Sequence, residues 1–335
     1  MKKIKLSYAF PAMHLEKQSP GFSAHWGDCQ FFINQEVEDC DVWVVFGGLQ
    51  KSEESTICPP SHTVFITGEP SMIWSYNQKF LKQFAKIITC QREIKGPGVI
   101  YGLQGHPWHV GLNHANPGDL GLAKNYDELI GIKDVPKTKL LSIITSDKQN
   151  TTGHRQRYKF ALSLKKALGD QADLFGRGLN DFNDKWEVLA PYKYSVAIEN
   201  CSTDDYVSEK LFDCYLAHTF PFYYGAPNVG SYFSPDSYEV IDINDLAGSV
   251  EKIKAIINNP NHYQEHLEAI KEAKIEYLNH YNIFPLIAEL VSAWPTNQPK
   301  VKVILKDSKS SWSNNWKILK DKAGTIFSKL FGDNF

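Results

Sequence analysis

The sequence predicts an α/β fold built on parallel sheets, and three observations lead to that prediction. Short apolar segments alternate with segments of helical periodicity along most of the 335 residues. Hydrophobic residues make up 42% of the chain and charged residues 22%, a composition typical of globular rather than disordered proteins. The chain is also long enough for two domains of ordinary size.

Nine short apolar segments are the expected strands: residues 4–8, 42–46, 64–67, 87–89, 140–145, 173–175, 195–198, 220–224 and 239–241. Helical patterns lie between them, among others at residues 76–84, 155–168, 209–217 and 246–258. Residues 96–134 are rich in Gly, Pro, His and Asn and show little periodicity, so we expect loops there, leading to a domain junction near Val135-Pro136.

Composition limits the functional classes. The formal net charge of −2 gives no general attraction to nucleic acid. Six cysteines without C-x-x-C spacing favour buried thiols in a reducing compartment over a zinc site. The first 14 residues have the pattern of a strand rather than of a secretory signal, and no run of 18 apolar residues predicts a membrane span. We therefore expect a cytoplasmic protein.

The most informative segment lies at residues 192–212. An apolar strand pattern ends on Glu199-Asn200, a loop of small and acidic residues follows, and a helix opens with Glu209-Lys210. Backbone N–H groups and the positive end of the helix dipole form a site for phosphate, and a lysine there adds a full charge. This arrangement suits a sugar diphosphate as leaving group.

The ordered series YKYSVAIEN, DYVSEKLFDCYLAHTFPFYYGAPNV and YF resembles the donor-binding signature of the α-1,3/4-fucosyltransferases, glycosyltransferase family 10, from about Lys139 to Ile243. The resemblance implies a GT-B architecture, in which two Rossmann-like α/β domains face each other across a cleft. We expect an acceptor-side domain over residues 1–135, a nucleotide-sugar-binding domain over 136–295 and a tail over 296–335.

Transfer of a sugar to a hydroxyl needs a general base within hydrogen-bond reach. Glu69, in the turn Gly68-Glu69-Pro70 after the segment 64–67, is the candidate. The resemblance implies this role, because the family has a Thr-Gly-Glu after a similar strand and its Glu is the proposed base. Without the resemblance, a Glu before Pro is more simply an exposed turn residue.

The departing diphosphate needs cations. Lys210 lies in the first turn of its expected helix, where a phosphate would bind. Arg155 begins the helix that follows the loop 146–152, and the family has an arginine at a similar place, so Arg155 is the first choice and Arg157 the second. Either arginine could instead be a solvated helix residue.

Four further residues match or adjoin the family's donor site. Asn200 and Glu209 are expected to bind ribose and sugar hydroxyls, and Tyr206 to pack on the nucleoside, although core packing of Tyr206 is an equal alternative. Arg177 lies between two glycines at a strand end and could line the donor pocket, unless those glycines only form the turn.

Other tempting features favour structural interpretations. Asp204-Asp205 lacks the D-x-D spacing of a metal-dependent transferase and better suits a helix cap or its approach. The run from His106 to His109 contains a proline, so a structural loop is more plausible than a zinc site. Trp108 and Trp74 could stack on an acceptor sugar, although burial is usual for tryptophan.

The tail is basic. From residue 300 onward it contains eight lysines and three aspartates, and an apolar set at helical spacing includes Trp312, Trp316 and Leu330. This pattern favours an amphipathic helix lying on a membrane surface, with a helix docked on the protein body as the alternative.

These observations together predict an inverting, metal-independent glycosyltransferase without a cofactor. The resemblance implies GDP-fucose as donor and a hydroxyl of a glycan, such as a lipopolysaccharide or surface polysaccharide, as acceptor, with an α-1,3 linkage. Expected partners are the donor, the acceptor and, through the tail, the cytoplasmic face of the inner membrane, but not nucleic acid. Alternatives are another nucleotide sugar as donor, or a binding protein that has lost turnover.

Overall fold

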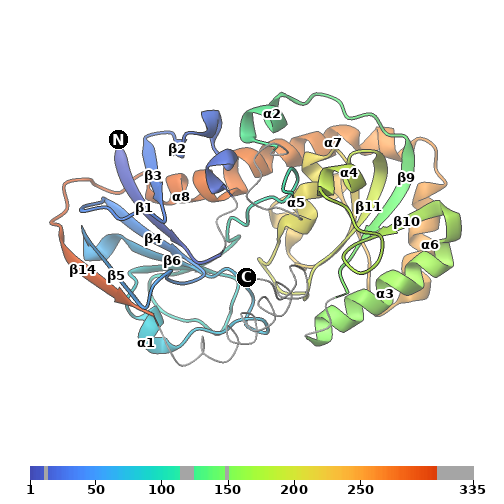
Figure 1. The fold of residues 1–335 in the computed structure, drawn as a ribbon. Helices are drawn as coiled ribbons and strands as arrows, with labels where there is room; N and C mark the ends of the chain where they lie inside the picture. Colours follow the sequence, from blue (N-terminus) through green and yellow to red (C-terminus); the bar gives the residue numbers. More distant parts are fainter. Residues whose placement is uncertain (11–13, 114–123, 148–150, 308–335) are drawn as a thin grey trace, which may run out of the picture.

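The computed structural model describes residues 1–10, 14–113, 124–147 and 151–307. Two α/β halves lie side by side, each around its own sheet (Figure 1). The first sheet is parallel except at its edge strand β2. Its spatial order is β2 (His25–Trp26), β3 (Cys29–Ile33), β1 (Lys2–Tyr8), β4 (Val42–Phe46), β6 (Thr63–Ile66), β7 (Lys86–Thr89) and β8 (Val99–Tyr101).

The second sheet is parallel throughout. Its order is β10 (Ala172–Phe175), β9 (Lys139–Ile144), β11 (Tyr192–Ile198), β12 (Phe220–Tyr224) and β13 (Glu239–Val240). The chain therefore changes direction across the sheet between β9 and β11. Ligands of open α/β sheets bind at such a switch point, beyond the carboxyl ends of the strands. This edge is where the Glu199-Asn200 pair follows β11.

The helices of the described residues are α1 (Gln78–Leu81), α2 (Tyr126–Gly131), α3 (Thr152–Leu168), α4 (Lys185–Leu189), α5 (Glu209–Leu216), α6 (Leu246–Ile257), α7 (His262–Glu276) and α8 (Ile283–Val291). Helix α7 packs in the core of the second half. Helix α8 packs in the first, because Ile283, Phe284, Ile287 and Val291 are buried with the β1 side chains. Figure 1 shows the two helices passing from one half to the other. The chain thus returns to the first half near Asn282, ahead of the expected boundary at residue 295.

All nine expected strands overlap observed ones, and the four expected helices overlap α1, α3, α5 and α6. The sequence did not predict β2, β3, β5 (Glu53–Cys58), β14 (Val301–Lys306), α4, α7 or α8. It also missed β8 and α2, which lie within residues 96–134, where only loops were expected. Strands β5 and β14 form a separate antiparallel pair with an alternating, half-exposed pattern. Their sequences contain fewer consecutive apolar residues than that of a buried parallel strand such as β4, so the apolar pattern did not identify them.

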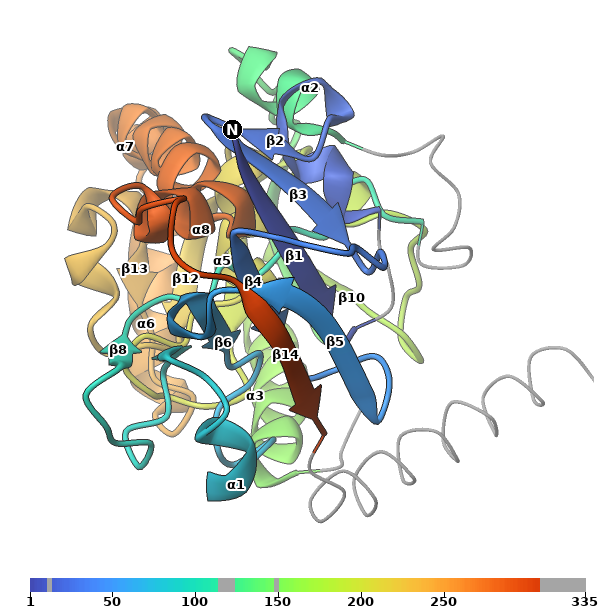
Figure 2. The same cartoon turned by 90° about the vertical axis from the view of Figure 1, so that its left-hand side faces the viewer.

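The tail was expected to be one basic amphipathic segment over residues 296–335, and its first part is not helical. Residues 301–306 form β14, which lies along β5 of the first half (Figure 2). The Lys300 ammonium lies 2.8 Å from a carboxylate oxygen of Asp39 and 2.8 Å from one of Asp41. The expected helix with Trp312 and Trp316 lies outside the described residues, so membrane contact through it stays a prediction.

Composition also led to expectations about cysteines and membrane spans. All six cysteines are buried and free, as the sequence indicated. Within the described ranges, none of the helices combines the length and apolar character needed to cross a bilayer.

Candidate active site

Glu69 follows β6 of the first half and lies where the two halves meet. Its Oε2 accepts a hydrogen bond of 3.0 Å from the hydroxyl of Tyr206, which belongs to the second half. The carbonyl of Glu69 accepts a bond of 2.8 Å from Gln91 Nε2, in the loop after β7. The Phe10 ring packs over the preceding Gly68, where an added Cβ would lie 2.7 Å from it. Glu69 is thus held from both halves, through its backbone by Gln91 and through its carboxylate by Tyr206.

Burial raises the pKa of the Glu69 carboxyl from 4.5 to about 7. The charge of Lys210 and the hydrogen bond from Tyr206 lower this pKa, while the nearby carboxylates Glu209 and Glu199 raise it. A carboxyl group with a pKa near neutrality can accept a proton at neutral pH, which is the property required of a general base.

A buried carboxylate joins the end of β11 to the start of α5. The Glu199 side chain is fully buried, and its oxygens accept hydrogen bonds from the Ser208 N–H at 2.7 Å and from the Ser208 hydroxyl at 2.8 Å. The Lys210 ammonium donates to Glu199 at 3.1 Å and to the Ser208 hydroxyl at 2.8 Å. Burial lowers the pKa of Lys210, but Glu199 and Glu209 outweigh it and raise the pKa overall. The expected phosphate-binding lysine is therefore a fixed cation.

Arg157, the second choice from the sequence, reaches this edge of the sheet, and Arg155 does not. Arg157 is 6% exposed and donates to Asn200 Oδ1 at 2.7 Å and to Ser146 Oγ at 3.1 Å. Ser146 follows β9 and Asn200 follows β11, so the guanidinium spans the switch point. Arg155 is exposed and donates to the Thr152 hydroxyl at 3.1 Å. Two helical positions differ by about 200°, so only one of the two arginines can face the sheet.

The first turns of α3 and α5 both lie at this edge. A Cβ on Gly153 would come within 2.0 Å of the Asn200 carbonyl oxygen, so α3 approaches the end of β11 as closely as only glycine allows. Glu199, one residue earlier, binds the first turn of α5. Two helix N-termini, Arg157 and Lys210 thus bring several N–H donors to one edge of the sheet, a set that suits a diphosphate.

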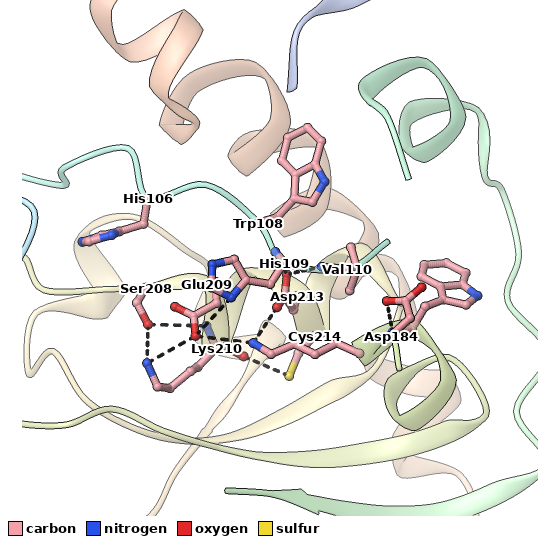
Figure 3. Close-up of polar contacts among 12 residues, drawn as sticks. His106, Trp108, His109, Val110, Asp184, Ser208, Glu209, Lys210, Asp213 and Cys214 are labelled. Carbon is pink, nitrogen blue, oxygen red and sulfur yellow. Dashed lines mark hydrogen bonds and ion pairs between the residues drawn. The ribbon is translucent and has the colours of Figure 1, made fainter. Parts of the chain in front are cut away.

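Glu209 lies within a chain of charges (Figure 3). Its Oε1 lies 3.4 Å from Lys185 Nζ, 3.5 Å from Lys210 Nζ and 3.8 Å from His109 Nδ1. Burial opposes ionisation, but Lys210 and Lys185 hold the pKa of Glu209 well below its usual value. Glu209 is therefore an ionised hydrogen-bond acceptor, the property that a ligand of sugar or ribose hydroxyls needs.

Asp213 extends this chain and was not predicted from the sequence. Its Oδ2 lies 2.8 Å from Lys185 Nζ, and its Oδ1 accepts the backbone N–H groups of His109 at 2.8 Å and Val110 at 3.2 Å. These bonds fix the loop that connects the halves onto α5 (Figure 3). The signal that could have found it is a carboxylate inside the otherwise apolar segment LFDCYL, which indicates a buried partner.

Tyr206 is a buried side chain rather than an open platform for a base. It is 2% exposed, and its ring meets His106 edge-on with centroids 5.6 Å apart. Only its hydroxyl reaches the site, at Glu69. Burial lowers the pKa of His106 to about 4, so this neighbour is neutral at pH 7. Of the two alternatives from the sequence, the structure favours core packing of Tyr206.

Arg177 lies beyond the cluster, in an exposed turn. Gly176 has φ of 142°, and a Cβ there would come within 1.4 Å of the Thr145 carbonyl oxygen, so this glycine shapes the turn against the end of β9. The Arg177 carbonyl accepts a bond of 3.3 Å from the Asp147 N–H. Arg177 thus lies at the correct edge of the sheet, but the structure does not bring it together with Lys210 and Arg157.

Asp205 joins the two halves. It is 3% exposed, its Oδ2 pairs with the Arg92 guanidinium of the first half, and its Oδ1 accepts from Asn228 Nδ2 at 2.7 Å and from the Tyr232 hydroxyl. Asp204 is more exposed and lies 3.8 Å from the same guanidinium. In the described part of the chain, no cluster of three or more His, Cys, Asp or Glu side chains is placed to hold a metal ion.

The two tryptophans considered as sugar platforms differ. Trp108 is fully buried and donates its indole N–H to the Lys124 carbonyl at 3.0 Å, so it is a core residue of the connecting loop. Trp74 is partly exposed, and its carbonyl accepts a bond of 2.7 Å from Gln91, the residue that also holds Glu69. Trp74 as an acceptor platform stays a prediction.

The model of glycosyltransferase family 10 (fucosyltransferase), C-terminal part, matches residues 135–304, which is half of the chain. The chain therefore belongs to glycosyltransferase family 10. The matched segment contains the second sheet, α5 and the cations described above, whereas Glu69 lies outside it.

Three curated relatives share part of the sequence. The chain is 35% identical over 85 residues to alpha-(1,3)-fucosyltransferase FucT of Helicobacter pylori, covering 25% of this chain and 18% of the relative. It is 32% identical over 102 residues to GDP-fucose protein O-fucosyltransferase 3 of Danio rerio, covering 30% and 22%. It is 36% identical over 87 residues to a putative fucosyltransferase-like protein of Arabidopsis thaliana, covering 25% and 17%. The similarity thus spans about a fifth of each relative.

Two solved structures are also similar. A crystal structure of alpha1,3-fucosyltransferase with GDP has 19% sequence identity and a TM-score of 0.49, covering 84% of this chain and 92% of that chain. An alpha-glucosyltransferase in complex with UDP and DNA has 11% identity and a TM-score of 0.49, covering 87% and 100%.

Proposed function

We propose that this chain transfers fucose from GDP-fucose to a hydroxyl of a glycan, with inversion at the anomeric carbon and without a metal ion. The observation that carries this proposal is the position of Glu69. Its carboxyl has a pKa of about 7 and lies on the first half, bonded to Tyr206 of the second half, on which Lys210 and Arg157 lie at the carboxyl edge of the sheet.

In the proposed mechanism, Glu69 removes the proton of the acceptor hydroxyl, and that oxygen attacks the anomeric carbon. The bond from this carbon to the GDP oxygen breaks on the opposite face, and the electron pair leaves with the diphosphate. Lys210 and Arg157 stabilise the charge that develops there. The departing GDP then needs no general acid to protonate it, because the cations stabilise the charge on its diphosphate. Glu209, which stays ionised, binds hydroxyls of the donor.

We propose fucose as the transferred sugar because the chain belongs to this family. The relatives' names cover different linkages and a different acceptor class, since an alpha-(1,4)-fucosyltransferase and protein O-fucosyltransferases occur beside the alpha-(1,3) enzymes. The proposed α-1,3 linkage on a lipopolysaccharide or surface polysaccharide therefore has to be tested on acceptors directly.

The test measures GDP release from GDP-fucose with EDTA present, first without acceptor and then with a panel of oligosaccharides. UDP-glucose, UDP-galactose and GDP-mannose serve as control donors. We expect GDP-fucose to be the one donor of this set that is turned over. GDP release should be faster when a suitable glycan acceptor is present, and NMR of the product then identifies the new linkage. Turnover with another donor would be consistent with the proposed mechanism but would refute fucose as the transferred sugar. Binding of GDP without turnover of any donor would indicate a binding protein, and a requirement for Mg²⁺ would contradict the metal-independent mechanism.

A further inference from the structure

Two adjoining cavities lie at the amino edge of the second sheet, opposite to the edge that carries the candidate active site. The larger has a volume of about 350 Å³ and the smaller about 230 Å³, and His218 lines both. Three neighbouring strands contribute to them, because Lys137 precedes β9, Lys193 lies at the start of β11 and His218 precedes β12. Helix α7 covers this edge and contributes Lys274.

The lining of this edge is basic, although burial lowers the pKa of Lys137 to about 7. Five lysines line the two cavities, and the one acidic residue in their lining, Asp134, is already 3.4 Å from the Lys271 ammonium. Burial and then the neighbouring Lys271 lower the pKa of Lys274 to about 8. Helix α7 also begins here, at His262, and the side chain of Asn261 does not cap it. Its positive dipole end adds to the field.

His218 offers a hydrogen bond that nothing in the described residues accepts. Burial and then the lysines Lys274 and Lys137 lower its pKa to about 3, so its imidazole is neutral and carries one N–H. Its Nε2 lies 3.2 Å from the Lys274 ammonium and must accept there, which places the proton on Nδ1. Nδ1 is buried and has no partner. A buried donor without an acceptor is costly, and this one belongs to a residue that lines both cavities.

The lysines differ in what they can still donate. Lys137 is saturated, because its ammonium donates to the carbonyls of Ala190 and Ala217 and to the Thr219 hydroxyl. Lys274 donates to the Ile132 carbonyl and to His218, which leaves one N–H. Lys193 is partly exposed and makes no hydrogen bond or ion pair within the described residues. The Lys193 ammonium and the remaining N–H of Lys274 are therefore the donors available to a ligand at this edge.

We propose that the larger cavity, with the smaller one beside it, binds the phosphate group of a small phosphorylated molecule, with Lys193 and Lys274 as donors and Lys137 and His218 in the surrounding lining. Several N–H donors in a positive field match the oxygens of a phosphate. A volume of about 350 Å³ exceeds that of inorganic phosphate and is typical of small-molecule sites. Tyr263, Gln264 and Leu267 line the remaining space and suit a partly polar body such as a sugar. This site is separate from the donor site and does not depend on the proposed function.

The test is calorimetric titration of the full chain with glucose 1-phosphate at constant ionic strength, with glucose as the uncharged control. Lys193→Gln should weaken glucose 1-phosphate binding about tenfold, the effect of losing one charge-assisted hydrogen bond. Two matched variants should leave that affinity unchanged: Lys159→Gln removes an exposed lysine of the same half, and Lys210→Gln alters the donor site. In ¹⁵N-histidine spectra, the His218 ring signals should shift on binding.

A second measurement distinguishes the sources of the phosphate group. Vesicles of phosphatidylcholine with phosphatidylglycerol are compared with vesicles of phosphatidylcholine alone in co-sedimentation. Loss of binding to the anionic vesicles in Lys193→Gln, but not in Lys159→Gln, would assign the site to a lipid headgroup. Binding of glucose 1-phosphate that depends on Lys193 would assign it to a soluble ligand. If Lys193→Gln changes neither measurement, the proposal is wrong.

Discussion

The two halves present different chemistry to the region where they meet. The first half contributes Glu69, whose carboxylate receives one hydrogen bond, from Tyr206, and whose pKa rises to about 7. The second half contributes Glu199, whose carboxylate receives two bonds from Ser208 and one from the Lys210 ammonium. Both glutamates follow a parallel strand. The comparison teaches that similar positions can have different contacts: burial raises the pKa of Glu69, whose carboxylate has one hydrogen bond within the described residues, whereas the carboxylate of Glu199 holds the Lys210 ammonium.

The largest effect is expected from Glu69→Gln. The amide keeps the size and can still accept the Tyr206 hydroxyl, but it cannot take a proton, so kcat with GDP-fucose should fall by about 10³-fold. GDP affinity, measured by calorimetry, should stay within about threefold of wild type, because the cations belong to the other half. Full activity in this variant would refute Glu69 as the base.

The next effect separates the two arginines. Arg157→Gln should weaken GDP binding by about 10- to 100-fold, because it removes the guanidinium that spans the switch point. Arg155→Gln, two residues away on the exposed face of the same helix, is the matched control and should change the affinity less than about threefold. Thermal unfolding of both variants verifies that Arg157→Gln is folded. A larger loss from Arg155→Gln would restore the first choice made from the sequence.

A smaller effect concerns pH. Activity should fall as pH drops through about 7, because protonated Glu69 is no base. The Tyr206 hydrogen bond favours the ionised carboxylate and lowers its pKa, so Tyr206→Phe should raise that pKa. The acidic limb of a plot of log kcat/KM against pH should therefore shift to higher pH by about half to one pH unit. A limb that stays in place would show that another group controls it.

The smallest effect is expected at the contact between the halves. Arg92→Gln removes the guanidinium from Asp205, but Asn228 and Tyr232 still donate to that carboxylate. Because Arg92 is partly exposed, urea unfolding should show a loss of only about 1 kcal/mol. The exposed pair Lys51–Glu36 of the first half offers a control, and Lys51→Gln should have less effect. Equal losses in both variants would mean that the Arg92 contact does not hold the halves together.

The pattern of apolar segments predicted much of the fold, because buried parallel strands such as β4 and β12 are continuous apolar runs. It did not predict that α8 crosses back to the first half. The apolar face of α8 shows that the helix is buried but does not show against which sheet. For the same reason β14 was missed, since its partner β5 lies some 250 residues earlier in the chain.

The sequence by itself determined the parallel α/β architecture, the family resemblance and the roles expected of Glu69 and Lys210, because these depend on local patterns and ordered motifs. Tertiary structure decided which arginine faces the switch point, since that depends on the rotation of α3 against the sheet. It also decided that Tyr206 is buried against His106 and bonded to Glu69. Tertiary structure also decided the pKa of the Glu69 carboxyl, because that pKa is raised by burial between two halves that are distant in sequence.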